Sequence, residues 1–162
     1  TITQVYTVTF DDHHGGTVSE DVTVTITGVN DAPTITNDAA AATGAVTEDE
    51  CASLTADGTL AIQDLDLTDT HTAAWSFKSS SVSSNLPGFG TGSHIGTFTI
   101  DAVSESSTDG NNGATLGWHF TLDNNDPVLQ SLAEGQTITQ VYTVTFDDQH
   151  GGKISQDVTV TI

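Results

Sequence analysis

The sequence predicts an all-β protein built as two antiparallel sheets packed face to face, with about seven strands. Apolar and β-branched residues alternate with polar ones along several segments, which is the pattern of half-buried strands. Clusters of Gly, Asn, Asp and Ser separate these segments, as expected of turns. The chain has 162 residues, which suits one ordinary domain with a short remainder.

The two ends of the chain are nearly identical in sequence. Residues 137–162 repeat residues 1–26 and differ only at four positions, which are His13/Gln149, Thr17/Lys153, Val18/Ile154 and Glu20/Gln156. Two copies this similar indicate a tandem array, with modules offset by 136 residues. We therefore expect residues 1–28 to be the C-terminal β-hairpin of a preceding repeat, 29–33 an inter-repeat joint, and 34–162 one complete module. Because methionine is absent, we also expect a slice of a longer polypeptide.

Each end repeat predicts a β-hairpin. Residues 1–10 and 18–26 alternate in character, and the intervening residues 11–16 end in two glycines that can adopt positive φ. The same hairpin is expected over residues 137–162. Because an isolated hairpin is marginally stable in water, residues 1–26 need a sheet to join, either in the preceding module or in a neighbouring chain.

The segment between the repeats predicts the remaining strands, which we place at residues 34–36, 45–48, 58–62, 72–77, 96–100 and 117–122. The first two read as one broken strand. Side chains expected in the core are Trp75, Phe98, Ile100, Trp118, Phe120 and Leu122. Residues 79–93 predict a long Ser- and Gly-rich loop, and 108–113 a turn. One short helix is expected between Asp126 as its N-cap and Gly135 just past its end.

The charge balance excludes several classes of protein. There are 22 acidic residues against two lysines and no arginine, for a formal net charge of −20. Nucleic acids and anionic membrane surfaces need basic residues, so neither is an expected partner. No apolar run reaches membrane-spanning length, and the single Cys51 excludes an internal disulfide framework. A compact chain with so many unpaired carboxylates repels itself, so we expect high salt, low pH or bound cations to stabilise it.

Three acidic segments are expected to meet at the joint. In an up-and-down sandwich, the turn after the second strand and the turn between the last two strands lie at the end where the chain comes in. The candidate metal ligands at this end are Asn30, Asp31, Asp64, Asp66, Asp69, Asp147 and Asp148. Glu48 and Glu50 are candidates at the opposite end, facing the next module. Six to eight oxygen ligands in flexible geometry suit Ca²⁺, although Asp and Asn are also common in ordinary turns because they bond their own backbone.

Ordered motifs along the chain resemble the VCBS repeat of giant bacterial surface proteins. The matching segments are residues 43–49, 58–66, 69–72, 96–98, 117–124 and 142–148 with Gly151 and Gly152, and the joint 28–33 resembles the connector of that family. The resemblance implies an Ig- or cadherin-like β-sandwich that serves as a tandem spacer in a large secreted (RTX-type) adhesin. It also implies type I export, an extracellular or cell-surface location, and calcium between modules.

Catalysis and transition-metal binding are not expected. The six histidines show no ligand-pair spacing, and no Gly-x-Ser-x-Gly motif or cleft-framing pair of carboxylates is present. The leading hypothesis is a structural spacer whose partners are neighbouring repeats of the same polypeptide. One alternative is a fibre of identical chains, in which residues 1–26 complete the sandwich of a neighbour. Another is a carbohydrate- or ligand-binding module that uses residues 79–93 or 101–115.

Overall fold

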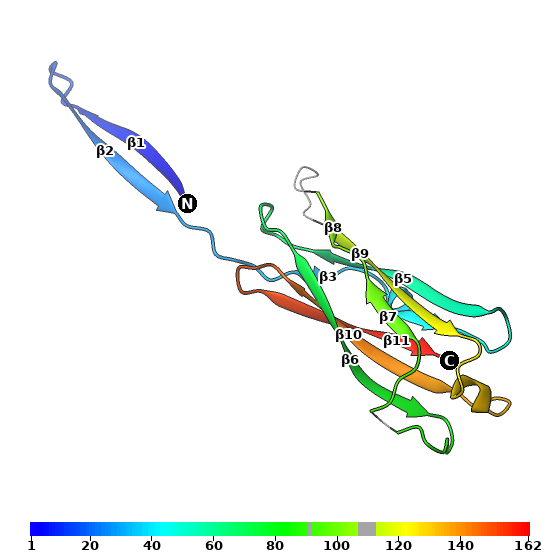
Figure 1. The fold of residues 1–162 in the computed structure, drawn as a ribbon. Coiled ribbons are helices and arrows are strands. Elements are labelled where there is room, and N and C mark those ends of the chain that lie inside the picture. The colour runs from blue at the N-terminus through cyan, green and yellow to red at the C-terminus, as the bar shows by residue number, and fades with distance from the viewer. Residues whose placement is uncertain (91, 107–112) are drawn as a thin grey trace. The chain divides into compact units, whose positions relative to one another are not determined.

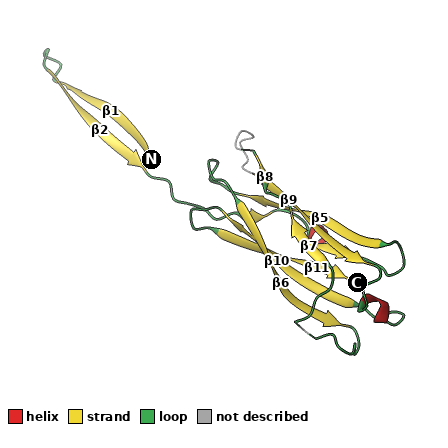
Figure 2. Cartoon of the chain, in the orientation of Figure 1, coloured by secondary structure: helices red, strands yellow, loops and turns green. Residues whose placement is uncertain are grey.

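The computed structural model describes residues 1–90, 92–106 and 113–162 (Figure 1). The chain divides into two compact units, Thr1–Asn30 and Asp31–Ile162. Strands dominate both units (Figure 2), and helical structure in the described ranges is limited to the 3₁₀ turns η1 (Ala39–Ala42) and η2 (Leu129–Ser131). The chain is therefore all-β, as the alternating pattern predicts.

The first unit is the predicted hairpin. Strand β1 (Ile2–Asp11) pairs antiparallel with β2 (Thr17–Ile26), from Ile2 opposite Ile26 to Asp11 opposite Thr17. The turn between them is held by Asp12, whose Oδ1 accepts hydrogen bonds from the backbone N–H of His14 and Gly16, both at 2.8 Å. Every residue of the two strands is exposed.

The second unit contains two sheets. The four-stranded sheet has the order β4 (Thr43–Ala45), β11 (Lys153–Thr161), β10 (Ile138–Asp147) and β6 (Thr72–Val82). The five-stranded sheet has the order β3 (Thr34–Ile35), β5 (Ser53–Gln63), β9 (Gly113–Asp123) and β7 (Thr97–Ile100), with β8 (Ser104–Glu105) also on β9. All pairs are antiparallel except β4 with β11, which is parallel. This arrangement is consistent with the predicted β-sandwich.

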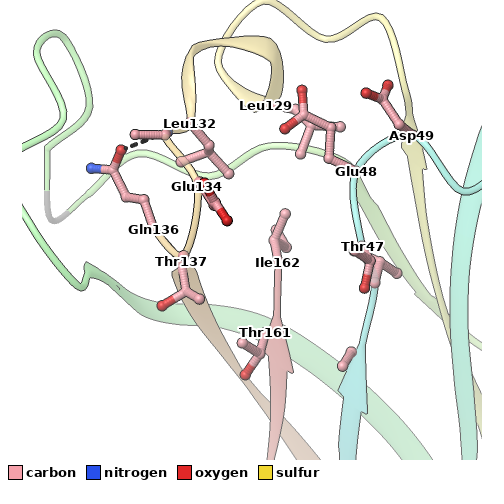
Figure 3. Close-up of a pocket in the computed structure, with 14 residues that line it drawn as sticks. Thr47, Glu48, Asp49, Leu129, Leu132, Glu134, Gln136, Thr137, Thr161 and Ile162 are labelled. Carbon is pink, nitrogen blue, oxygen red and sulfur yellow. Dashed lines mark hydrogen bonds between the residues drawn. The ribbon is translucent and has the colours of Figure 1, made fainter.

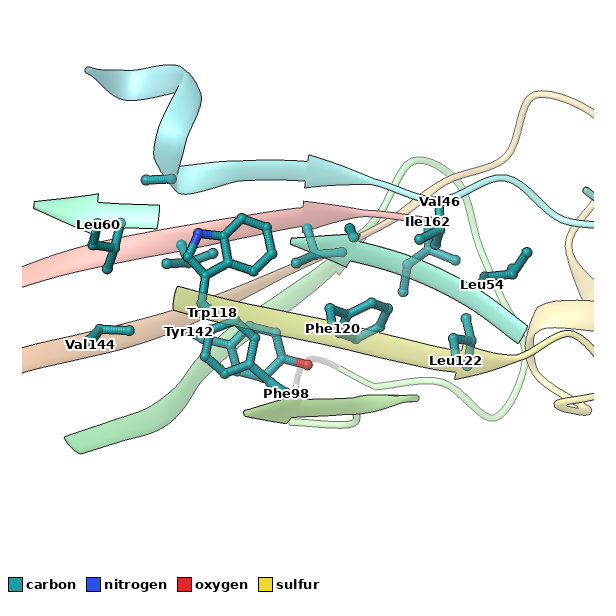
Figure 4. Close-up of a cluster of buried hydrophobic side chains, with 14 of the residues drawn as sticks. Val46, Leu54, Leu60, Phe98, Trp118, Phe120, Leu122, Tyr142, Val144 and Ile162 are labelled. Atoms are coloured by element: carbon teal, nitrogen blue, oxygen red, sulfur yellow. The ribbon is translucent and has the colours of Figure 1, made fainter. Parts of the chain in front are cut away.

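Large side chains from both sheets form one hydrophobic core (Figure 4). Trp118 of β9 is fully buried, and its indole N–H donates to the carbonyl of Ala41 at 2.8 Å. A Cβ on Gly58 would lie 2.6 Å from that carbonyl and from the indole nitrogen, so glycine is required there. From the opposite sheet, Tyr142 stacks on Phe98 with ring centroids 4.2 Å apart. These contacts between the sheets contribute the burial that stabilises the unit.

Several predicted strand limits differ from the structure. Strand β6 continues through Val82 into the segment predicted as a loop, because Ser79 to Ser81 pair with β10. The predicted strand 45–48 lies instead at Thr43–Ala45. Both β5 and β9 are longer than predicted, and the short strand β8 was missed. The predicted turn at 108–113 lies almost wholly outside the described residues.

The predicted helix and one predicted core residue are wrong. Asp126 does accept from the N–H of Val128 at 2.8 Å, but only the three residues of η2 are helical, followed by a positive φ at Gly135. Trp75 is 41% exposed, because β6 is the edge strand of its sheet. Its ring still contacts the core residue Phe98 in a T-shaped pair, with centroids 5.3 Å apart. Ile100 is half-buried, whereas the four other predicted core residues are fully buried.

Candidate metal site

Three buried aspartates meet at one end of the second unit. Asp64 follows β5, Asp69 lies in the loop between β5 and β6, and Asp148 follows β10. Each offers one carboxylate oxygen, and these oxygens all lie within 4.8 Å of one another. The three residues are 2%, 8% and 0% exposed, respectively. Carboxylates are rarely buried unless they are paired or bind a metal, so this cluster could hold a metal ion.

The turn after β10 fixes Asp148. Its Oδ1 accepts from the backbone N–H of His150 at 2.8 Å and of Gly152 at 2.9 Å. Positive φ angles at Gln149 and Gly151 bring the turn back on itself. A Cβ on Gly152 would overlap the Asp148 carboxylate and lie 2.8 Å from Cα of Ala32. The first residues of the second unit therefore pack directly against this turn.

The two other carboxylates are held less completely. Oδ1 of Asp64 accepts from the backbone N–H of Asp66 at 2.9 Å. Oδ2 of Asp69 is buried and lies 3.1 Å from Nδ1 of His150, but it makes no hydrogen bond to any described residue. A buried carboxylate oxygen in this state retains a lone pair for a cation.

His71 and Glu105 also lie beside these carboxylates, although the sequence did not predict either residue at this site. His71 is buried, with Nε2 at 3.2 Å from Oδ2 of Asp64 and Nδ1 at 2.8 Å from Oε2 of Glu105. Burial lowers the pKa of His71, but the hydrogen bonds to Glu105 and Asp64 outweigh it, so the pKa is raised above its ordinary value. Its position directly after the acidic loop was a signal that we did not use. Glu105 is 34 residues from His71, and no local pattern indicates their contact.

The other candidate ligands predicted at this end are not part of the cluster of three. Oδ2 of Asp66 accepts from the backbone N–H of Asp31 at 2.6 Å, which ties the connector to the loop after β5. Asp147 pairs with Lys153 at 2.6 Å, and this hydrogen bond holds the pKa of Asp147 below its ordinary value. Asn30 belongs to the first unit.

The acidic segment that follows β4 lies next to a separate pocket. Glu48 lines this pocket of about 460 Å³ together with Thr161 and Ile162 (Figure 3), and Glu50 is exposed. Among the described residues, Glu48 and Glu50 belong to no cluster of three or more potential metal ligands.

The donor set favours a hard divalent cation. All three central groups are carboxylates in loops or turns, and hard divalent cations bind carboxylate oxygens. Such an ion would give the buried oxygen of Asp69 a partner. It would also reduce the mutual repulsion of the three close carboxylates. The formal net charge of −20 adds a general need for cations.

Comparison with known proteins adds no assignment. No protein-family model matches the chain, and no curated protein matches it. Across the residues that the structure describes, no helix has the length and apolar character needed to cross a bilayer. The geometry of the site is therefore the basis for a functional proposal.

Proposed function

We propose that residues 31–162 form a structural spacer module of a repetitive extracellular bacterial adhesin or surface filament, stiffened by Ca²⁺ at the connector. The observation that carries this proposal is the position of the buried Asp64, Asp69 and Asp148 beside the first residues of the unit. Ala32 packs on Gly152 next to Asp148, and Asp31 bonds to Asp66 in the loop that also bears Asp69. An ion bound there links the connector to the loops of both sheets.

Calcium is the proposed ion because the ligands are hard oxygen donors in segments of irregular backbone. Ca²⁺ tolerates such geometry, whereas Mg²⁺ requires a near-ideal octahedron. Asp64, Asp69 and Asp148 would hold the ion and lose their mutual repulsion. Extracellular modules bind Ca²⁺ with dissociation constants of about 10⁻⁴–10⁻³ M, so the proposed site would be filled outside a cell.

The finer fold that we propose is an Ig- or cadherin-like sandwich in a tandem array. Two features support it. The first strand of the second unit is divided between its two sheets, because β3 pairs with β5 and β4 then pairs with β11. The hairpins β1–β2 and β10–β11 also share one register, with Tyr6 opposite Val22 and Tyr142 opposite Val158. Repeated modules with equivalent joints would make an extended, stiff protein rather than an enzyme.

Thermal unfolding with and without calcium tests this function. We expect millimolar Ca²⁺ to raise the Tm of the full chain relative to EGTA, and Asp148→Asn to remove the increase. Asp12→Asn is the matched control, because Asp12 makes the same turn hydrogen bonds without the buried partners. A wild-type Tm and hydrodynamic radius that do not respond to Ca²⁺ would overturn the proposal.

A further inference from the structure

The first unit exposes an apolar face that its copy buries. Phe10 is 64% exposed, whereas the equivalent Phe146 is 0% exposed. Tyr6 is 53% exposed, and the equivalent Tyr142 is 1% exposed. The same contrast holds for five further pairs, which are Ile2/Ile138, Val8/Val144, Val22/Val158, Val24/Val160 and Ile26/Ile162. So large an apolar face on a two-stranded hairpin indicates a binding surface.

Sequence identity between the copies is complete at the positions that face the core. Ten residues of 137–162 are buried, and all ten are unchanged in the first unit; they are Ile138, Gln140, Tyr142, Val144, Phe146, Asp148, Gly152, Val158, Val160 and Ile162. The four differences fall on exposed or half-buried positions. Residues 1–26 therefore carry every side chain that is buried when residues 137–162 occupy their place in the second unit.

The two copies also share a buried polar residue, a glutamine. Gln140 is fully buried, and its amide bonds both backbone groups of Ile95, with Oε1 accepting from N–H at 2.8 Å and Nε2 donating to the carbonyl at 3.0 Å. Gln4 is the same residue in the first unit. On either side, β6 pairs with β10 and β4 pairs with β11. A hairpin placed there thus gains main-chain hydrogen bonds on both edges.

We use "shell" for residues 31–136, which are the second unit without its own hairpin. The number of residues between Ile26 and Ala32 determines whether the first hairpin can reach the shell of its own chain. In the place of 137–162, Ile26 would stand where Ile162 stands, ten residues of extended chain or about 33 Å from Gly152. Ala32 lies at the place of Gly152 and is held there by β3, two residues on, which pairs with β5 inside the shell. Six residues from Ile26 to Ala32 span at most about 22 Å. The hairpin therefore cannot enter the shell of its own chain.

We propose that residues 1–26 are an exchange hairpin that docks between β4 and β6 of a second copy of this chain, in the place held by residues 137–162. Each copy offers one such hairpin and one shell, so the contact is head-to-tail and open-ended. The hairpin at 137–162 competes for the shell with the advantage of a direct tether. Exchange is therefore favoured when that hairpin is weakened or when the concentration of chains is high.

A matched pair of substitutions in the full chain tests the proposal. Phe146→Asp places a charge in the core and disables the hairpin at 137–162. Phe10→Asp makes the same change in the exchange hairpin. Light scattering in EGTA, from micromolar to near-millimolar concentration, should show Phe10→Asp as a monomer. Phe146→Asp should form oligomers whose mean mass rises severalfold with concentration, and these should keep the near-ultraviolet circular dichroism of the buried Trp118.

The double variant separates specific exchange from general aggregation. With both phenylalanines replaced, no competent hairpin remains, so we expect loss of the Trp118 signal and no ordered growth. The proposal is overturned if Phe146→Asp is a folded monomer, if it loses the Trp118 signal, or if its mass follows that of the double variant. Because calcium is absent throughout, these outcomes do not depend on the proposed metal site.

Discussion

Replacing Asp69 by asparagine should stabilise the calcium-free protein and remove its response to calcium. The three carboxylate oxygens lie within 4.8 Å of one another, and at an effective dielectric constant of about 20 each ionised pair at that distance repels by about 3.5 kcal/mol. The substitution removes two of the three repulsions. It breaks no side-chain hydrogen bond at Oδ2, which has none among the described residues.

The net gain is smaller than the sum of the two repulsions. The imidazoles of His71 and His150 lie 3.2 Å from Asp64 and 3.1 Å from Asp69, respectively, and they offset part of the repulsion. We expect Asp69→Asn to gain about 1–3 kcal/mol in EGTA. The wild-type protein should gain about 2.7 kcal/mol when Ca²⁺ is at a hundred times its dissociation constant, and the variant should gain almost nothing.

Urea unfolding followed by tryptophan fluorescence measures both effects. Asp57→Asn is the control, because it removes the same charge from an exposed position on β5. A loss of stability in EGTA would refute the electrostatic reasoning, and a full calcium response in Asp69→Asn would refute the ligand assignment.

Three further predictions concern packing, the connector and pH. Phe146→Ala should cost about 3–5 kcal/mol by denaturant unfolding, because the ring is fully buried, whereas Phe10→Ala should leave the unfolding of the second unit within about 0.5 kcal/mol of wild type. Gly152→Ala should lower the Tm and weaken calcium binding in titration calorimetry, because its Cβ would overlap the Asp148 carboxylate and press on the connector. Lys78, then the hydroxyl of Thr143, holds the pKa of Asp157 below its ordinary value, so Lys78→Ala should cost at most about 1 kcal/mol at pH 7. This difference should vanish as the pH falls from about 4 through the lowered pKa, and a difference that persisted in acid would contradict the pairing.

Local patterns predicted much of the fold. The alternation over the repeated hairpin predicted half-buried strands, and along β10 every second residue is buried. Strand β6 was predicted too short because residues 79–93 are rich in Ser and Gly, which is typical of loops, yet pairing with β10 holds Ser79 to Ser81 extended. The expected helix after Asp126 is reduced to η2, where Leu129 is fully buried as the chain passes from one sheet to the other. Tertiary packing overrode local preference in both places.

The candidate site was predicted only in outline. Turns rich in aspartate indicated carboxylates at the connector end, but not which of them would be buried together. Asp147 is the last residue of β10 and pairs with Lys153 across the hairpin, whereas the adjacent Asp148 is buried with Asp64 and Asp69. The contact of His71 with Glu105 depends on β8, which local preference did not reveal.

The sequence by itself determined the strand pattern, the duplicated hairpin and the excess of acidic groups, because these depend on neighbouring residues and on composition. Only the tertiary structure decided which hairpin is buried and which carboxylates meet. The two hairpins share every core-facing residue, yet one lies inside the four-stranded sheet of the second unit with its apolar face buried, and the other is exposed. Burial and charge proximity are properties of the partners that a segment finds, and here those partners come from distant parts of the chain.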